Sequence, residues 1–214
     1  MRMRKKKNAQ SRMSACADIM IQNPTVLKGK WDELYGKGRQ IFLEIGCGKG
    51  SFITQLAKQN PDNFYIALEV VPDVIMLAME KAIKENISNV KFMCFDAKNL
   101  CEVFMDGELA GIYLNFSDPW PKNRHFKRRL TYIAFLEIYK KIIKNGGNIF
   151  FKTDNRPMFD FSLVQFNEAE IELCQVCTDL HNSMWEKGNI HTEYEDNFSS
   201  KGFCINRLVG KIKK

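Results

Sequence analysis

The segment from Gly111 to Pro121 constrains the fold of this chain more than any other. It begins with the short apolar run Gly-Ile-Tyr-Leu, which is typical of a buried strand in a parallel sheet. Asn-Phe-Ser-Asp-Pro-Trp-Pro follows, and its two prolines favour extended geometry for the residues before them, Asp118 and Trp120. Ligands bind at the carboxyl ends of the strands in open α/β sheets, so the segment predicts a carboxylate fixed at a ligand-binding edge.

The rest of the chain predicts strands that alternate with amphipathic helices. This order is typical of an α/β protein with a Rossmann-like, doubly wound parallel sheet. A length of 214 residues suits one domain, which we expect over residues 25–214, after a basic, flexible arm at residues 1–24. The expected strands are 40–45, 64–70, 90–95, 111–114, 148–152, 171–176 and 204–209, and the expected helices are 52–58, 73–85, 131–144 (ended by Asn145-Gly146-Gly147) and 157–168.

The charge of the chain indicates a polyanionic partner. The formal net charge is +7, and Lys and Arg concentrate at residues 2–7, 122–129 and 211–214. No apolar run is long enough to span a bilayer and no signal peptide is recognisable, which predicts a cytosolic protein that is not bound to a membrane. Each basic run alone is also compatible with a solvated surface, and charge does not separate RNA from DNA or acidic lipid.

The seven cysteines predict neither disulfides nor a metal site. They are scattered, and those at 47, 94, 101 and 204 have apolar neighbours, so we expect reduced thiols in the core. Cys174 and Cys177 form the only Cys-x-x-Cys pair, but they lie in a predicted strand and would point to opposite faces. No second Cys or His pair has zinc spacing, so we expect no metal.

A glycine-rich turn follows the first predicted strand, in the sequence Glu-Ile-Gly-Cys-Gly-Lys-Gly-Ser at 44–51. Glycines let the backbone approach a ligand, and the next helix offers free N–H groups. The spacing does not fit a phosphate-binding P-loop, and a dinucleotide fingerprint would need glycine where Ser51 stands. The remaining form, E-x-G-x-G-x-G, is similar to motif I of S-adenosylmethionine-dependent methyltransferases, while a purely structural turn stays open.

Two more acids end the next predicted strands. Glu69 ends the second strand, where a ribose-binding acid is expected in this fold, and Asp96 ends the third. Carboxylates accept hydrogen bonds, so Glu69 suits ribose hydroxyls and Asp96 suits an adenine amino group. Either acid alone could be a helix cap, but acids at three successive strand ends, with Glu44 the first, favour a cofactor site.

Taken together, these segments resemble the bacterial tRNA guanine-7-methyltransferase family. The resemblance covers about residues 40–208 and rests on EIGCGKGSF, ALEV, FDA, NFSDPWPKNRHFKRRL, FKTDN and TEYEDNFSSKG in matching order. It implies transfer of a methyl group from S-adenosylmethionine to nitrogen 7 of guanine at position 46 of tRNA. It also implies the strand order 3-2-1-4-5-7-6 with an antiparallel last strand.

The resemblance also implies roles for individual residues. Asp118 would be catalytic and would also lie at the cofactor. The remaining residues would bind the cofactor (Glu44, Gly46, Gly48, Gly50, Glu69, Asp96 and Ala97), the substrate guanosine (Lys122, Asp154, Thr192, Glu193, Tyr194 and Glu195) and the RNA (Arg124, His125, Phe126, Lys127, Arg128 and Arg129). Residues 191–198 are expected to form a polar loop that folds over this edge.

The chemistry favours positioning over base catalysis, because nitrogen 7 of guanine has a free lone pair. The ring gains positive charge, which Asp118 or Asp154 could stabilise, with Glu193 or Glu195 sharing the role. Trp120 and Phe126 are candidates for stacking on a base or for ordinary packing. A methyltransferase with another substrate, a non-catalytic RNA-binding protein and a nicotinamide-dependent dehydrogenase remain alternatives, and the sequence does not decide between a monomer and a homodimer.

Overall fold

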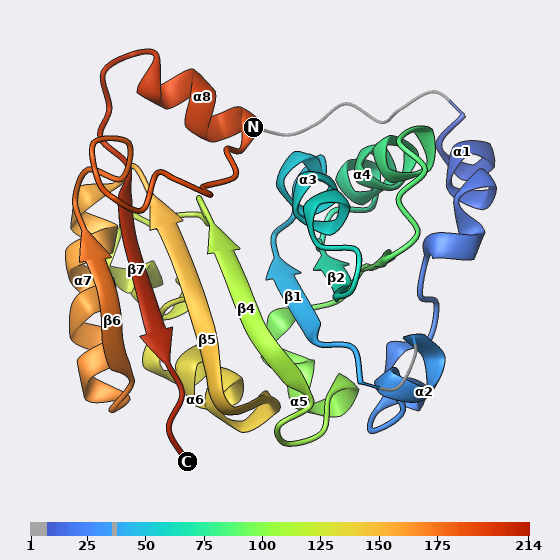
Figure 1. The fold of residues 1–214 in the computed structure, drawn as a ribbon, viewed down its shortest axis with the longest axis horizontal. Coiled ribbons are helices and arrows are strands. Elements are labelled where there is room, and N and C mark those ends of the chain that lie inside the picture. The colour runs from blue at the N-terminus through green and yellow to red at the C-terminus, as the bar shows by residue number, and fades with distance from the viewer. Residues whose placement is uncertain (1–7, 36–37) are drawn as a thin grey trace.

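In a computed structural model, which describes residues 8–35 and 38–214, the chain forms one seven-stranded sheet (Figure 1). The strand order is β3-β2-β1-β4-β5-β7-β6, and β7 runs antiparallel to both of its neighbours, β5 and β6. This confirms the predicted fold class and strand order. The strands are β1 Ile41–Ile45, β2 Phe64–Leu68, β3 Val90–Met93, β4 Leu109–Asn115, β5 Ile143–Thr153, β6 Glu172–Cys177 and β7 Asn206–Lys211.

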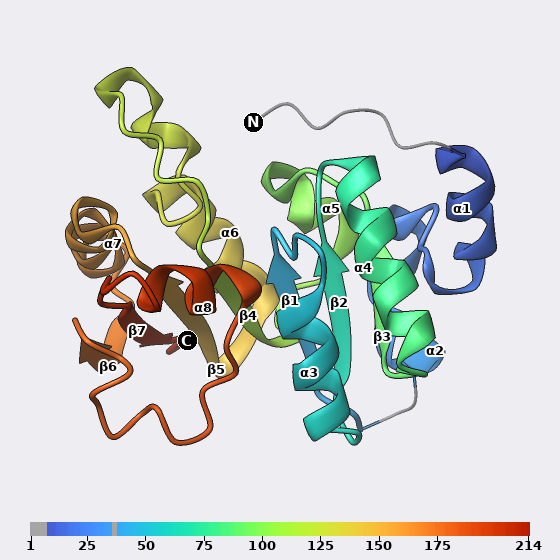
Figure 2. The same cartoon turned by 90° about the horizontal axis from the view of Figure 1, so that it is seen from above.

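Helices cover the two faces of the sheet unequally. The helices α5, α6 and α7 pack on one face, and α3 and α4 pack on the other face over β1 to β3 (Figures 1 and 2). Figure 1 shows no helix in front of β5, β7 and β6. The helices are α1 Ala9–Ala15, α2 Trp31–Tyr35, α3 Ser51–Gln59, α4 Pro72–Lys84, α5 Leu100–Val103, α6 Ile133–Ile142, α7 Arg156–Glu168 and α8 Glu193–Ser199, with 3-10 turns η1 Ala17–Ile19, η2 Pro24–Leu27, η3 Ala97–Asn99 and η4 Asn123–Arg128.

The burial of each strand follows its place in the sheet. Every residue of β2 is buried, as expected for a strand between two helical layers, whereas β6 at the edge alternates between exposed and partly buried residues. The alternation puts Cys174 and Cys177 on opposite faces, as predicted. The expectation of core thiols is wrong for Cys94 and Cys204, which are exposed, and all seven cysteines are free.

The start of β5 differs from the prediction. Asn145-Gly146-Gly147 was expected to separate a helix from a strand at 148–152, but β5 begins at Ile143, directly after α6. The register against β4 shifts between Leu109 and Gly111, so the glycines form an irregularity inside the strand. A Cβ at Gly147 would lie only 2.6 Å from the carbonyl oxygen of Ala110, which explains glycine at this close approach.

The N-terminal segment packs on the domain where a flexible arm was expected. The run at residues 2–7 lies outside the described residues, but residues 8–24 form α1 and η1 against α4 and β3. Arg12 donates two hydrogen bonds of 2.6 Å to Glu80, Cys16 is 2% exposed, and the Ile21 amide bonds the Phe92 carbonyl at 2.8 Å. The apolar side chains of residues 8–24 are therefore used for packing.

None of the helices in the described part of the chain is both long and apolar enough to cross a membrane.

Candidate functional site

The glycine-rich turn joins the carboxyl end of β1 to the first turn of α3. Gly46, Gly48 and Gly50 have φ angles of 79°, 56° and 78°, which residues with a side chain rarely adopt. A Cβ at Gly50 would lie 2.7 Å from the Cβ of Ala78, so this glycine also lets α3 pack closely on α4. The turn lines a cavity of about 390 Å³, which we name the loop cavity.

Glu44 provides a carboxylate at the floor of the loop cavity. It is 2% exposed, and Asn115 donates a hydrogen bond of 3.0 Å to its Oε1, but its buried Oε2 has no partner in the described structure. Burial raises the pKa of Glu44 to about 7, although the hydrogen bond from Asn115 acts in the opposite direction. A buried acceptor without a donor fits a site for a cationic ligand group.

A second cavity, of about 540 Å³, collects the acids that follow β2, β3 and β4, and we name it the acid cavity. Glu69, Asp96, Ala97 and Asp118 all line it, so the structure brings together the acids that the sequence placed at separate strand ends. Glu69 accepts from the amides of residues 48, 70 and 71, and Asp96 caps η3 through the Lys98 amide. These two acids therefore stabilise their own turns and also face the cavity.

Phe116 lies between the two cavities and lines both of them. Its φ of 50° is a strained value for an aromatic residue, and strain of this kind gathers at functional sites. The Phe116 amide bonds the Lys152 carbonyl at 2.9 Å, so the pairing of β4 with β5 holds this geometry. The ring contacts Tyr194 at a centroid distance of 5.0 Å, and this contact links the end of β4 to α8.

The proline-bracketed turn differs from the prediction at Trp120. This residue was expected to be extended, but its φ is 41°. Arg129 holds the turn, because its guanidinium donates to the carbonyls of Pro119 at 2.9 Å and of Trp120 at 3.2 Å. Arg128 lies over the Trp120 ring at 4.9 Å. The contacts of Arg128 and Arg129 therefore help to decide the shape of the turn, in addition to the preference of a residue before proline for extended geometry.

The basic segment at 122–129 protrudes from the body of the protein between β4 and α6 (Figure 2). Lys122, Arg124, Lys127 and Arg128 are exposed, as a phosphate-binding surface requires. Arg129 instead points inward to the proline turn. The two candidates for stacking on a base, Trp120 and Phe126, both make packing contacts. The Trp120 ring is in edge-on contact with His125, and the Phe126 ring contacts Tyr132 and Phe161.

The polar stretch at 191–198 was expected to be a loop, but residues Glu193–Ser199 form α8. The missed signal is a capping box: Thr192 accepts from the Glu195 amide at 2.9 Å, and Glu195 accepts from the Thr192 amide. Glu193 joins α8 to α3 and α4 through hydrogen bonds from Ser51 and Lys81. These bonds lower the pKa of Glu193 to about 2.

Glu195 lies on α8, and its side chain is fully buried. This burial distinguishes Glu195 from the other predicted substrate contacts. Its carboxylate accepts from Lys152 at 2.6 Å, Asn189 at 2.8 Å and His181 at 3.0 Å. Burial alone would raise the pKa of Glu195, but Lys152, Asn189 and His181 hold it below the usual value. These residues, with Glu186, His191 and Asp196, are named the α8 network.

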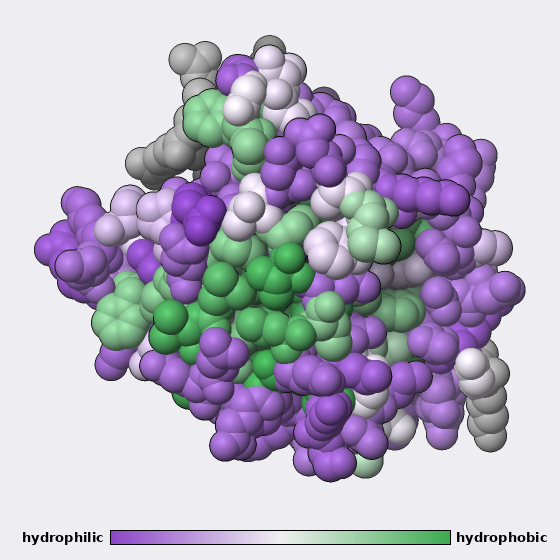
Figure 3. All heavy atoms as spheres, turned by 60° about the vertical axis from the view of Figure 1, so that its left-hand side comes forward, coloured by the Kyte–Doolittle hydropathy of each residue, from purple (hydrophilic) through white to green (hydrophobic). Residues whose placement is uncertain are grey.

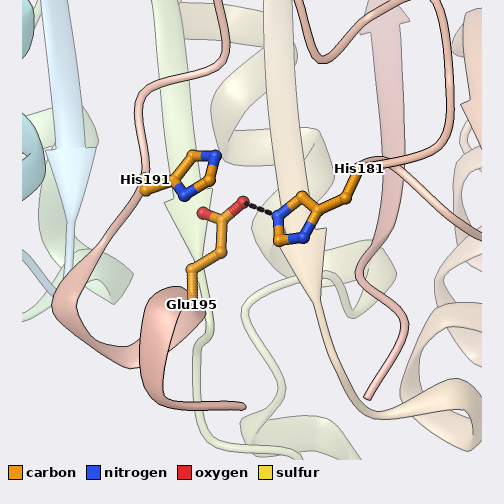
Figure 4. Close-up of side chains that lie close together, drawn as sticks. All are labelled: His181, His191 and Glu195. Carbon is orange, nitrogen blue, oxygen red and sulfur yellow. Dashed lines mark hydrogen bonds and ion pairs between the residues drawn. The ribbon is translucent and has the colours of Figure 1, made fainter. Parts of the chain in front are cut away.

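His181, His191 and Glu195 lie close enough together to suggest a metal site (Figure 4). However, both ring nitrogens of His191 are bonded to carboxylates, to Glu186 at 2.6 Å and to Asp196 at 2.7 Å. Burial lowers the pKa of His191, but these two hydrogen bonds outweigh it and the net direction is upward. An imidazole with both nitrogens bonded to carboxylates has none left to bind a metal, and the adjacent ammonium of Lys152 disfavours a cation, so we interpret the cluster as an ion-pair network.

The two cavities divide the predicted site. The loop cavity holds Thr192, Glu193 and Tyr194 with the glycine turn, and Gly46 lines both cavities. Lys122, Asp154 and Gly50 line neither, although burial and then the nearby carboxylate of Asp154 raise the pKa of Tyr194. Three lining residues of the loop cavity were not predicted from the sequence: Asn115 at the end of β4, Phe116 directly after it, and Phe52 on α3.

Solved structures of other proteins share this fold. A 16S rRNA methyltransferase, KamB, matches with a TM-score of 0.66 and 15% identity over 87% of this chain and 94% of its own. A SAM-dependent methyltransferase from Aquifex aeolicus matches with a TM-score of 0.56 and 14% identity over 97% and 100%. The fold is therefore that of class I methyltransferases.

Sequence relatives define the family within that class. Residues 38–208 match a family described as putative methyltransferase. A tRNA (guanine-N(7)-)-methyltransferase of Listeria welshimeri is 49% identical over the full length of both chains, and one of Streptococcus pneumoniae is 45% identical over 99% of this chain and 100% of its own. This chain belongs to the tRNA (guanine-N7)-methyltransferase family.

Proposed function

We propose that this protein transfers a methyl group from S-adenosylmethionine to nitrogen 7 of guanine at position 46 in the variable loop of tRNA. The observation that carries the proposal is the meeting of the glycine turn with carboxylates from successive strands, in two cavities that share Gly46 and Phe116. We also propose that the enzyme acts in the cytosol, that residues 25–214 form its catalytic domain, and that its site needs no metal.

The residues present fit the cofactor. Glu44 offers a buried oxygen without a donor, which suits the ammonium of the methionine part. Glu69 and Asp96 offer acceptors for ribose hydroxyls and for the adenine amino group, beside Ala97. S-adenosylmethionine, when bound, supplies an electrophilic methyl group. The Gly46, Gly48 and Gly50 turn gives this ligand room against the backbone.

The protein's own task is to place the guanine and to stabilise its charge. The nitrogen 7 lone pair forms the new bond, and no proton has to leave first, so orientation dominates. The purine becomes cationic, and a carboxylate at its Watson–Crick edge would stabilise that charge. We assign this role to Asp118 as the catalytic residue, and we assign guanosine contacts to Lys122, Asp154, Thr192, Glu193 and Tyr194.

Glu195 has a different proposed role from the one the resemblance implied. Its side chain is buried in the α8 network and is saturated with donors, so it is placed to position α8 over the loop cavity. We propose that the exposed cations at Lys122, Arg124, Lys127 and Arg128 bind tRNA phosphates, which makes affinity fall with salt. Arg129 supports this surface from within.

The test is transfer of labelled methyl from S-adenosylmethionine to unmodified tRNA, with the product nucleosides resolved. A parallel tRNA carries another base at position 46. We expect label in 7-methylguanosine that disappears with the replacement. Label in another nucleoside would reject the substrate assignment, and cofactor and RNA binding without transfer would reject the enzyme assignment.

A further inference from the structure

A third cavity, of about 320 Å³, opens on the face of the sheet that carries no helix over β5 and β7. We name it the open-face cavity. Phe52 and Asn115 line both this cavity and the loop cavity, so the two adjoin. Figure 3, in which the side of the protein that carries β6 and α7 comes forward, shows an apolar area bordered by hydrophilic residues. Aromatic side chains of Tyr113, Phe150 and Trp185 contribute to the lining of the open-face cavity.

The charge of the open-face cavity is one-sided. Lys152, Lys187 and Arg207 line it, whereas no Asp or Glu in the described ranges does so. Lys152 is fully engaged, by Glu195, by Asn189 and by the Ile190 carbonyl. The cavity therefore presents a net positive surface next to the proposed methyl-transfer site.

Arg207 is the group in this cavity that lacks a partner. Its side chain has no hydrogen bond or ion pair with any described residue, and its Nη1 is shielded from solvent. Its guanidinium lies over the Trp185 ring, 6.0 Å from the ring centroid. Gln175, on the adjacent strand β6, likewise has a buried oxygen without a donor. Buried polar atoms without partners are rare in folded proteins, and two in one cavity indicate a ligand.

The register of the sheet makes the lack of a partner for Arg207 more destabilising. Arg207 lies directly opposite Lys152 in the antiparallel pair of β5 and β7. Like charges facing each other across a strand pair destabilise it. Glu195 compensates the charge of Lys152, while none of the carboxylates in residues 8–35 and 38–214 pairs with Arg207. Burial also lowers the pKa of Arg207, so the site is one in which an anion would be stabilising.

We propose that the open-face cavity is a subsite for a nucleotide that adjoins the target guanosine, with Arg207 and Lys187 binding its phosphodiester. This inference rests on the proposed function. A phosphodiester suits the planar guanidinium, which forms paired charge-assisted hydrogen bonds. The rings of Tyr113, Phe150 and Trp185 suit a base, and the Gln175 oxygen suits a ribose hydroxyl. The cofactor carboxylate is a poor alternative, because Arg207 lines neither the loop cavity nor the acid cavity.

The experiment measures tRNA binding and methylation at several salt concentrations for the whole protein. Arg207→Gln should weaken tRNA binding roughly tenfold and reduce the slope of log affinity against log salt by about 1, with an unchanged KM for S-adenosylmethionine. Arg207→Lys should keep the slope, since the charge remains. Lys187→Gln, on an exposed loop residue, should reduce the slope without affecting folding.

Lys211→Gln is the matched control. Lys211 lies on β7 and faces the same side of the sheet as Arg207, but it is at the opposite end of the strand and lines none of the three cavities. It removes the same charge and should leave the affinity and the slope close to those of the unmodified protein.

Three outcomes would overturn the subsite. These are an unchanged tRNA affinity and slope in Arg207→Gln, an equal loss in Lys211→Gln, or a dimer of the unmodified protein that Arg207→Gln dissociates, as sedimentation would detect. Failure of the proposed function is separate: the unmodified protein would then not methylate position 46, whereas direct RNA binding would still test Arg207.

Discussion

Two groups of charged side chains at the carboxyl edge of the sheet differ in whether their polar atoms have partners. In the α8 network, Glu195 accepts three hydrogen bonds from side chains, and His191 bonds two carboxylates. In the cavities beside it, Glu44 Oε2 and Arg207 Nη1 have none within the described residues. A satisfied buried network stabilises structure, whereas an unsatisfied buried group is destabilising until a ligand binds. The α8 network therefore stabilises the structure around the site, whereas Glu44 and Arg207 have polar atoms available to bind ligands.

The largest effect is expected when the α8 network loses its cation. Lys152→Met leaves the buried carboxylate of Glu195 without its main partner, so the free energy of unfolding should fall by about 3–5 kcal/mol. Chemical denaturation measures it. The double variant Lys152→Met, Glu195→Leu should recover much of the lost stability, because it also removes the buried carboxylate that has lost its partner. An unaffected single variant would show that the pair is not structural.

Replacing the proposed catalytic carboxylate tests the other side of the comparison. Asp118 is exposed at the acid cavity, so Asp118→Asn should leave thermal stability nearly unchanged. We expect kcat to fall about 100-fold, because the charge that stabilises the cationic purine is lost. Asp160→Asn, which affects an exposed surface pair on α7, serves as the control. Unchanged turnover in Asp118→Asn would remove Asp118 from the catalytic site.

Glu44 should show opposite effects on binding and stability. Its pKa is raised to about 7 in the folded protein from 4.5, so the unfolded chain binds fewer protons between these values and stability falls as pH rises from 4.5 to 7. Glu44→Gln should remove that fall and raise stability at pH 8. It should also weaken S-adenosylmethionine binding roughly tenfold, since the ammonium loses its carboxylate.

The same ionisation predicts a pH dependence of the unmodified enzyme. Cofactor affinity should rise as pH increases through about 7, where Glu44 ionises, and titration calorimetry at pH 6 and pH 8 measures it. The dependence should be absent in Glu44→Gln. Equal affinities of the unmodified enzyme at both pH values would argue against an ammonium at Glu44.

The smallest effect is expected at His191. Its pKa is raised in the folded protein, so its contribution to stability is present below about pH 6.5 and is lost as pH rises through the folded value. His191→Gln should therefore cost more stability at pH 6 than at pH 9. The difference should stay below about 1 kcal/mol, because the ring is partly exposed and screened. A larger loss at pH 9 would contradict the ion-pair interpretation.

Local sequence signals predicted the parts of the site that depend on backbone geometry. The glycines at 46, 48 and 50 do adopt positive φ, and the acids at 69, 96 and 118 do meet at one cavity, because parallel strands end at the same edge. The prediction failed at α8, where the capping pair Thr192 and Glu195 was not recognised as a helix start. It also failed at β5, because a glycine pair ends a helix or forms a bulge depending on the strand beside it.

The sequence by itself determined the fold class, the glycine turn, the acid at each strand end and the family, since these depend on short-range patterns and on resemblance. Only the tertiary structure decided which charges have partners. Lys152 and Arg207 are 55 positions apart and carry the same charge, yet Lys152 pairs with Glu195, whereas Arg207 lines the open-face cavity without a hydrogen-bond partner among the described residues. Strand register and burial set that difference, and neither can be read from the residues around each position.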